Sequence, residues 1–291
     1  MQLVTFTEAS TTRLGVLDGD QVVDLAASAP DCPREMCAFL AAGDVAMAAA
    51  RAALANGGAR IPRTRVKLEA PILRPPKILA VGLNYADHVA ETGMERPTLP
   101  IIFNKQATAV TGPTDPMHLP RASTMLDYEG ELGVVIGKRC RHVPLEKAAS
   151  VIAGYTIVND GSVRDWQLRV PTMTMGKSFD THCPMGPALV TADEVGDPHQ
   201  LGLQTWVNDE LRQTSNTREL IFDSFALIEH LSTAFTLEPG DVISTGTPGG
   251  VGVAMKPPKY LVAGDVVRVA IEKLGELVTP VIAEPADTVR Y

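Results

Sequence analysis

The stretch LDYEGELGVVIG, Leu126–Gly137, joins an apolar strand pattern to three acidic residues at alternate positions. Because side chains along a β-strand alternate between its two faces, Asp127, Glu129 and Glu131 would share one face. Two ionised carboxylates on one face repel each other by roughly 4 kcal/mol at about 4 Å and an effective dielectric constant of about 20. Solvent screens that repulsion on a wet edge strand, whereas an enclosed face needs a shared proton, a basic neighbour or a metal ion. This stretch alone leaves both possibilities open.

A further acid ends the next apolar strand pattern, GYTIVNDGSVRD, where Asp160 follows Asn159. Functional groups gather where rigid elements end. Together with Glu129 and Glu131, Asp160 would complete an all-oxygen ligand set, which suits Mg²⁺, Mn²⁺ or Ca²⁺ rather than zinc. Three carboxylates also leave positions on an octahedral ion open for water and substrate oxygens. The second stretch therefore favours a metal site over a wet strand.

Composition limits the class of protein. The chain has 291 residues, of which 45% are hydrophobic and 21% charged, as in one large globular domain or one domain plus a small one. A net charge of -8 argues against a nucleic-acid partner, because no excess of Lys and Arg can neutralise phosphates. We find no signal-peptide pattern and no apolar run of about 18 residues, so we expect a cytoplasmic protein without a membrane span.

Two residue types attract attention without predicting a site. The cysteines form no C-x-x-C pair, so a zinc knuckle is not expected and reduced thiols are; they are Cys32, Cys37, Cys140 and Cys183. Five histidines are assigned no role and are read as surface or core residues: His118, His142, His182, His199 and His230.

The pattern of elements predicts a strand-dominated α+β fold with two units. Residues 1–70 read as a small α/β unit, with two short strands, a DGD hairpin turn and one Ala-rich helix within residues 33–58. A proline-spaced linker, Glu69–Lys77, precedes the larger unit, residues 71–291. That unit is rich in short β-branched strands, with helices expected at LEKAASVIAG, 145–154, and SFALIEHLSTAF, 224–235. Because strands and helices do not alternate, a doubly wound parallel sheet is not favoured.

Five segments together resemble the fumarylacetoacetate hydrolase family, closest to its short bacterial and mitochondrial members. They occur in the same order over roughly residues 70 to 285: GLNYADHVAE (82–91), DYEGELGVVIGKRC (127–140), VNDGSVRDWQ (158–167), GKSFDTHCPMGP (176–187) and LEPGDVISTGTPGGVG (237–252). The resemblance implies the family's mixed β-sandwich/roll core, a homodimer and Mg²⁺ or Mn²⁺ bound by Glu129, Glu131 and Asp160. It also implies a small keto-acid substrate, a 2-keto or 1,3-dicarbonyl acid.

The family's reactions share one intermediate. Its members hydrolyse acylpyruvates, decarboxylate oxaloacetate or shift protons in related keto acids, and each reaction passes through an enolate that a divalent ion stabilises. We expect a C–C bond hydrolase of acylpyruvate-type acids. The alternative is an oxaloacetate decarboxylase or keto–enol tautomerase using the same metal site. A non-catalytic homologue is disfavoured, because such a chain would be expected to have lost part of the residue set.

The remaining site residues follow from the resemblance. His88 and Glu91 lie one helical turn apart and would activate water as a base and its carboxylate partner, under a lid at TGMERPTLP, 92–100; without the resemblance, an exposed helix is the simpler interpretation. Lys177 would balance developing negative charge. Arg164, Gln167 and Thr247 would bind substrate oxygens. Asp127 has no role in the family and is expected toward solvent or behind the ligands.

Overall fold

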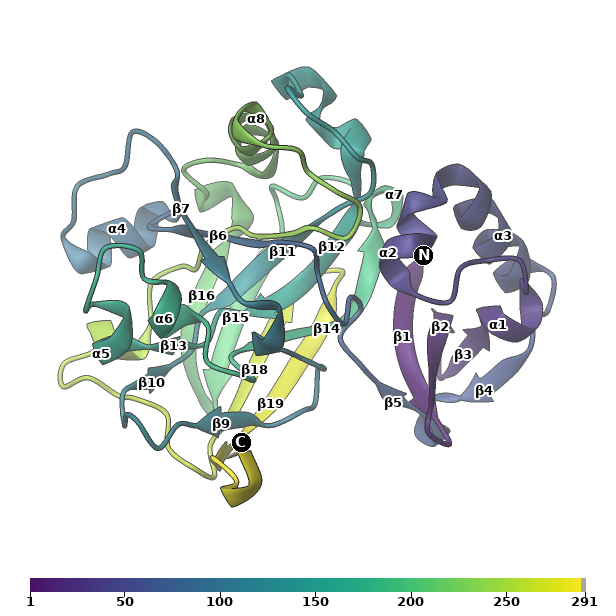
Figure 1. The fold of residues 1–291 in the computed structure, drawn as a ribbon. Helices are drawn as coiled ribbons and strands as arrows, with labels where there is room; N and C mark the ends of the chain where they lie inside the picture. The colour runs from purple at the N-terminus through teal and green to yellow at the C-terminus, as the bar shows by residue number, and fades with distance from the viewer. Residues whose placement is uncertain (289–291) are drawn as a thin grey trace.

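The computed structural model describes residues 1–288, and strands dominate it (Figure 1), which confirms the predicted strand-rich α+β fold. The largest sheet has 12 strands. Ten of them follow one path: β4 (Arg60–Pro62), β3 (Gln21–Asp24), β2 (Thr11–Asp18), β1 (Gln2–Glu8), β14 (Cys183–Thr191), β12 (Ile152–Asn159), β11 (Gly130–Ile136), β17 (Val242–Ser244), β6 (Ile78–Gly82) and β7 (Ile101–Lys105). Off this path, β5 (Lys67–Leu68) pairs with β1 and β8 (Val110–Thr111) with β14.

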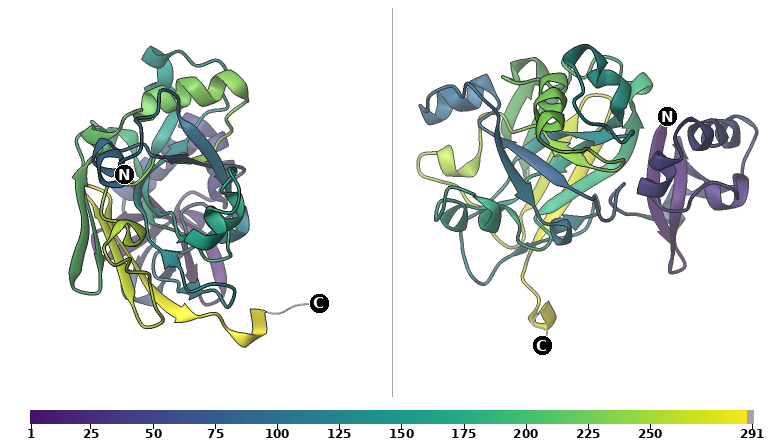
Figure 2. Two further views of the ribbon diagram at one scale, coloured as in Figure 1. Left: turned by 90° about the vertical axis from the view of Figure 1, so that its left-hand side faces the viewer. Right: turned by 45° about the horizontal axis from the view of Figure 1, so that its top comes forward.

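The N-terminal unit stands to one side of the larger body, as the right-hand view of Figure 2 shows, yet it shares that body's sheet. β1 pairs with β14 in an antiparallel register at Gln2↔Val190 and Leu3↔Leu189. The unit's helices are α1 (Leu25–Ser28), α2 (Met36–Ala41) and α3 (Gly43–Ala55). The prediction of one Ala-rich helix was wrong: α2 ends at Ala41, and a new helix, α3, begins at Gly43, whose left-handed backbone with φ 62° changes the direction of the chain.

A second sheet of five strands covers the first. Its order is β16 (Glu210–Asn216), β15 (Gly202–Val207), β18 (Val266–Ile271), β19 (Gly275–Ala283) and β9 (Met117–Leu119). Leu132 of β11 and Ile157 of β12 share one buried apolar cluster with Val269 and Leu277 of the second sheet. The two sheets therefore pack as a sandwich. β11 is buried along its whole length, because it lies between β12 and β17 in one sheet and beneath the other.

Helices are short outside the N-terminal unit. The predicted helix at the start of residues 145–154 is instead a run of 3₁₀ turns, Leu145–Val151, because Ile152 and the residues after it join β12. The helix predicted at 224–235 is confirmed as α8 (Ser224–Ala234). The others are α4 (Ala86–Thr92), α5 (Arg164–Gln167), α6 (Thr174–Lys177) and α7 (Ala192–Val195). None of the helices in residues 1–288 combines the length and apolarity that crossing a membrane requires.

Candidate active site

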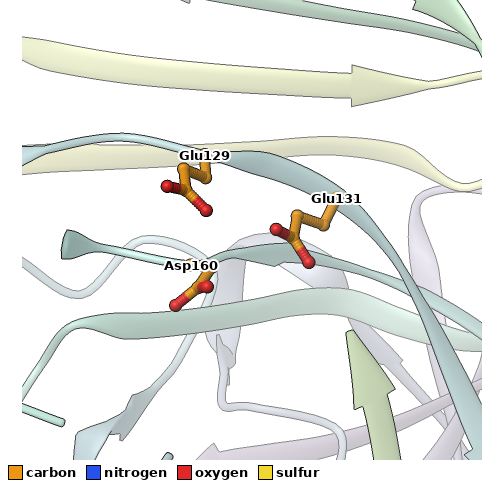
Figure 3. A group of neighbouring side chains, drawn as sticks. All are labelled: Glu129, Glu131 and Asp160. Carbon is orange, nitrogen blue, oxygen red and sulfur yellow. The ribbon is translucent and has the colours of Figure 1, made fainter. Parts of the chain in front are cut away.

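Three buried carboxylates meet where β11 begins and β12 ends. Glu129 precedes β11, Glu131 lies in it and Asp160 follows β12; the antiparallel pair Gly130↔Asn159 brings the three together. Each offers an oxygen within 4.8 Å of the others' oxygens, and all three side chains are buried. Figure 3 shows the carboxylates turned toward a common space. The acids predicted as ligands are thus neighbours, and the wet edge strand is excluded by their burial.

Two of the carboxylates are paired with cations. Lys177 Nζ lies 2.8 Å from Glu129 Oε2 and 2.8 Å from Asp160 Oδ2. Arg164 Nη1 lies 2.6 Å from Glu129 Oε1, and Lys105 Nζ lies 2.6 Å from Asp160 Oδ1. Burial raises the pKa of Glu129, but Lys177 and Arg164 outweigh burial and hold that pKa well below its ordinary value. Glu129 is therefore ionised, with cations on two sides.

Among residues 1–288, no cationic side chain pairs with Glu131. Its Oε2 accepts hydrogen bonds from Ser244 Oγ at 2.6 Å and from the Gly246 amide at 2.9 Å. Its other oxygen, Oε1, accepts no hydrogen bond from any of residues 1–288. Burial, followed by the charges of Asp160 and Glu129, raises the pKa of Glu131 well above its ordinary value. The ionised form of this carboxylate is therefore the one that a bound cation would stabilise most.

The charge count of the cluster fits a divalent cation. With all groups ionised, four buried carboxylates of residues 1–288 face three buried cationic side chains, and 4 minus 3 leaves one negative charge uncompensated. The carboxylates are Asp127, Glu129, Glu131 and Asp160, and the cations are Lys105, Arg164 and Lys177. The three clustered acids supply hard oxygen donors of the kind that Mg²⁺ and Mn²⁺ prefer. A divalent ion would turn the local charge positive, ready for an anionic substrate.

His88 and Glu91 form the predicted pair on α4. His88 Nδ1 lies 3.2 Å from Glu91 Oε2, and Glu91 Oε1 accepts a hydrogen bond from the Gly250 amide at 2.9 Å. Asp87, next to His88, accepts a hydrogen bond from Ser215 Oγ at 2.6 Å. The structure thus forms the pair and ties α4 to the loop at residues 246–250, whose Gly246 amide binds Glu131.

Arg164 joins Glu129 to a fourth buried carboxylate, Asp127. Its guanidinium lies 2.8 Å from Asp127 Oδ2, in addition to its contact with Glu129, and Nη1 donates to Gln167 Oε1 at 2.9 Å. Asp127 is 0% exposed and also accepts hydrogen bonds from the Gly252 and Val253 amides. Of the two places expected for Asp127, solvent is therefore excluded, and the residue lies behind the ligands as the anchor of Arg164.

Thr247 lies beside the triad, but its hydroxyl proton is already donated in a hydrogen bond to the protein backbone. Thr247 Oγ1 donates to the Gly130 carbonyl at 3.0 Å and accepts a hydrogen bond from Gln213 Nε2 at 2.7 Å. In this arrangement the hydroxyl has no proton to offer a substrate carboxylate, although one acceptor position is left.

Sequence reasoning missed Lys105, which ends β7. Its ammonium is buried and donates to Asp160 and to the Gly161 and Lys177 carbonyls. A lysine at the end of the apolar pattern PIIFNK was the available signal, since a buried strand that ends in a cation needs a partner for it.

Comparisons with known proteins show what this chain resembles. The family model described as fumarylacetoacetate (FAA) hydrolase C-terminal matches residues 77–282. An oxaloacetate tautomerase, fahd2, mitochondrial, from Xenopus laevis is 44% identical over 288 residues, which is 97% of this chain and 90% of the relative. Maleylpyruvate hydrolase from Sphingobium sp. SYK-6, solved with manganese(II) and pyruvate, superposes with a TM-score of 0.83 at 37% identity, covering 98% and 100% of the two chains. A fumarylacetoacetate hydrolase from Exiguobacterium antarcticum has a TM-score of 0.86 at 35% identity, again covering 98% and 100%.

Proposed function

The chain belongs to the fumarylacetoacetate hydrolase family, and we propose that it is a divalent-metal-dependent hydrolase of C–C bonds in small acylpyruvate-type 1,3-dicarbonyl acids. The observation that carries this proposal is the enclosed acid triad, together with the His88–Glu91 pair that is linked to it by the loop at residues 246–250. The solved maleylpyruvate hydrolase that contains manganese(II) and pyruvate supports both the metal and the product class.

A divalent ion, when bound, supplies the positive charge that polarises a keto group and stabilises negative charge on its oxygen. The chain supplies the proton transfers. We assign His88, held by Glu91, as the base that removes a proton from water. The water oxygen bonds to the distal carbonyl carbon, and the C–C bond then breaks. Its electron pair goes to pyruvate enolate, which takes up a proton to give pyruvate, while the acyl group leaves as a carboxylic acid.

Buried cations would hold the substrate's negative charge. Lys177 lies between Glu129 and Asp160, where its ammonium can also face an anionic substrate oxygen. Arg164 and Gln167 are hydrogen-bonded to each other beside Glu129, and we propose that they orient the substrate carboxylate. Thr247 is retained as a substrate contact only as a hydrogen-bond acceptor.

A second candidate is keto–enol tautomerisation or decarboxylation of oxaloacetate. The observation that favours it is the 44% identity to a relative named as an oxaloacetate tautomerase over nearly the whole chain. Here His88 would move a proton to or from the carbon between the two carbonyls, and no water would add. The two candidates share the enolate and the acid triad and differ in how the enolate forms: by attack of water and C–C cleavage in the first, and by loss of a proton or of CO₂ in the second.

Product-resolved NMR distinguishes the candidates. Metal-free protein is loaded with Mg²⁺ and incubated separately with acetylpyruvate and with oxaloacetate. Hydrolysis predicts acetate and pyruvate from acetylpyruvate. Intact acetylpyruvate beside accelerated enolisation or decarboxylation of oxaloacetate would replace hydrolysis by the second candidate, and no turnover of either acid would contradict both.

The proposal also covers the oligomeric state, the metal, the location and the domain division of the protein. We propose a homodimer that uses Mg²⁺ or Mn²⁺, the latter supported by the manganese-containing neighbour. We keep a cytoplasmic location on the sequence pattern alone, while noting that the Xenopus laevis relative is named as mitochondrial. We also propose that residues 1–70 and 71–291 are separate domains; the start of the family match at residue 77 supports this division.

A further inference from the structure

Gly130, the residue between Glu129 and Glu131, has both of its main-chain polar groups bound by side chains from distant segments. Its amide donates to Gln213 Oε1 at 3.0 Å, and its carbonyl accepts from Thr247 Oγ1 at 3.0 Å. Gln213 Nε2 donates in turn to Thr247 Oγ1 at 2.7 Å. A closed ring of hydrogen bonds therefore holds the backbone directly between the two glutamates.

The ring lies on the edge of β11 that faces β17, at a point where β17 no longer pairs with it, although β12 still pairs on the other edge. β17 pairs with β11 only over Gly133 to Val135, and the next bond on that edge runs from the Thr245 amide to the Leu132 carbonyl at 3.0 Å. Beyond it, the side chains of Thr247 and Gln213 bind Gly130 in place of a strand backbone. On this edge the ring takes the place of a strand ladder, while β12 pairs with Gly130 and Glu131 on the other edge.

Gln213 is built into this place by the second sheet. It lies in β16, is 0% exposed and uses both amide protons, since Nε2 also donates to the Pro248 carbonyl at 2.9 Å. These partners fix the orientation of the Gln213 side-chain amide, because the backbone N–H of Gly130 needs an oxygen as its acceptor. A Cβ on Gly130 would lie 2.3 Å from Thr205 Oγ1, so glycine lets the second sheet approach this closely.

The same glutamine also fixes the loop that reaches the His88–Glu91 pair. Pro248 lies two residues before Gly250, whose amide donates to Glu91 Oε1. Gln213 therefore contacts the strand that carries the ligand glutamates and the loop that holds the carboxylate partner of His88.

Resting on the proposed metal-dependent function, we propose that Gln213 is a positioning residue for the reaction. It aligns Glu129 and Glu131 for the divalent ion and aligns the Thr247–Gly250 loop for the His88–Glu91 pair. Thr247 completes the ring, which we call the Gly130 clamp, because its hydroxyl proton is donated to the Gly130 carbonyl.

Mn²⁺ titration into metal-free protein tests the clamp without any substrate. We expect Gln213→Met, which keeps the length of the side chain and removes its three hydrogen bonds, to bind Mn²⁺ about 10- to 100-fold more weakly, as is typical when support behind metal ligands is lost. Gln204→Met is the matched control, an exposed glutamine on the adjacent strand β15, and its Mn²⁺ affinity should equal that of the unmodified chain. Wild-type affinity in a folded Gln213→Met protein would overturn the proposal.

Thr247 variants keep the test decisive if Gln213→Met does not fold. Thr247→Ser retains the hydroxyl and should keep Mn²⁺ affinity, whereas Thr247→Val should lose affinity. If the double variant folds, Gln213→Met with Thr247→Val should bind Mn²⁺ no more weakly than Gln213→Met alone, because each substitution breaks the same ring of hydrogen bonds. Equal affinity of the Ser and Val variants, or additive losses, would overturn the clamp.

The turnover assay separates this proposal from the function on which it rests. Unmodified protein that binds Mn²⁺ but converts no keto acid would remove the proposed function and leave the clamp to be judged by the variant affinities. Full turnover together with unchanged affinity in the variants would remove the clamp alone. Unmodified protein that binds no Mn²⁺ would overturn both.

Discussion

Lys177 lies between Glu129 and Asp160, with its Nζ 2.8 Å from an oxygen of each carboxylate. Burial lowers the pKa of Lys177, but Asp160 and Glu129 outweigh burial and raise that pKa above its ordinary value, so the side chain stays an ammonium. A fixed cation therefore shares two carboxylates with the proposed metal site. The third, Glu131, is left to the divalent ion.

Lys177→Met separates charge balance from metal binding. The ammonium competes with a divalent ion for Glu129 and Asp160, so its removal should leave Mn²⁺ affinity unchanged or stronger. Turnover should nevertheless fall by about 100-fold or more, because a cation facing the substrate's developing charge is lost. Calorimetric titration and kcat measure the two effects. Lys138→Met, on the surface, is the control, and loss of Mn²⁺ binding in Lys177→Met would contradict the assignment.

Glu131→Gln should have opposite effects on stability and on metal binding. The amide can still accept from Ser244 and Gly246, while the buried charge that repels Asp160 and Glu129 disappears. We expect metal-free protein to become more stable, on the order of 1–2 kcal/mol, and Mn²⁺ affinity to fall at least about 100-fold. Urea unfolding in EDTA and calorimetry measure the changes, with the exposed Glu146→Gln as control. A less stable metal-free variant would show that Glu131 is not an uncompensated charge.

His88→Gln tests whether the imidazole activates water. Loss of a general base should reduce acetylpyruvate hydrolysis by about 10²- to 10⁴-fold. Decarboxylation of oxaloacetate needs no water activation and should fall far less. NMR rates on both acids measure the ratio, and the exposed His230→Gln provides the control. Equal losses on the two substrates would show that His88 has a general role rather than a hydrolytic one.

Buried His182 should make the stability of the protein depend on pH. Burial, with further effects from Lys105 and His118, lowers its pKa to about 4, whereas an unfolded histidine titrates near pH 6.5. The unfolded chain therefore binds the proton first, and stability is lost as pH falls from about 6.5 toward 4. This residue should cost about 2 kcal/mol between pH 7 and pH 5.

Urea unfolding of His182→Gln at pH 7 and pH 5 measures that cost. The glutamine amide can still donate to the His118 carbonyl, as Nε2 of His182 does at 2.8 Å. The variant should lose about 2 kcal/mol less than the unmodified chain over this interval, whereas the exposed His230→Gln should behave as the unmodified chain. An identical pH dependence in His182→Gln would refute the lowered pKa.

Local patterns predicted the parts of the site that lie on single segments. Alternation at Glu129 and Glu131 and the acid that ends β12 identified the triad, and the one-turn spacing of His88 and Glu91 identified their contact. The Glu129–Glu131 and His88–Glu91 spacings need only the geometry of one strand and one helix, whereas Asp160 meets the glutamates through the pairing of β11 with β12. The family resemblance then assigned roles that spacing alone left open.

Contacts between distant segments escaped prediction. Gln213 reaches Gly130 from another sheet, and Lys105 reaches Asp160 from β7, so both roles depend on how the sheets stack. The break at Gly43 depends on a left-handed turn within an otherwise continuous Ala-rich pattern. Burial of Asp127 follows from its contact with Arg164, which no strand periodicity reveals.

Deuterium exchange into pyruvate tests whether the acid triad supports enolate formation, because every candidate reaction passes through an enolate. Pyruvate is incubated in D₂O with Mg²⁺-loaded protein, and the decay of its methyl ¹H signal is followed by NMR. We expect the signal to decay much faster than with Mg²⁺ alone. This acceleration should disappear when the metal is chelated and in the Glu131→Gln variant. Exchange no faster than the Mg²⁺ control, or equal exchange in Glu131→Gln, would contradict enolate chemistry at this triad.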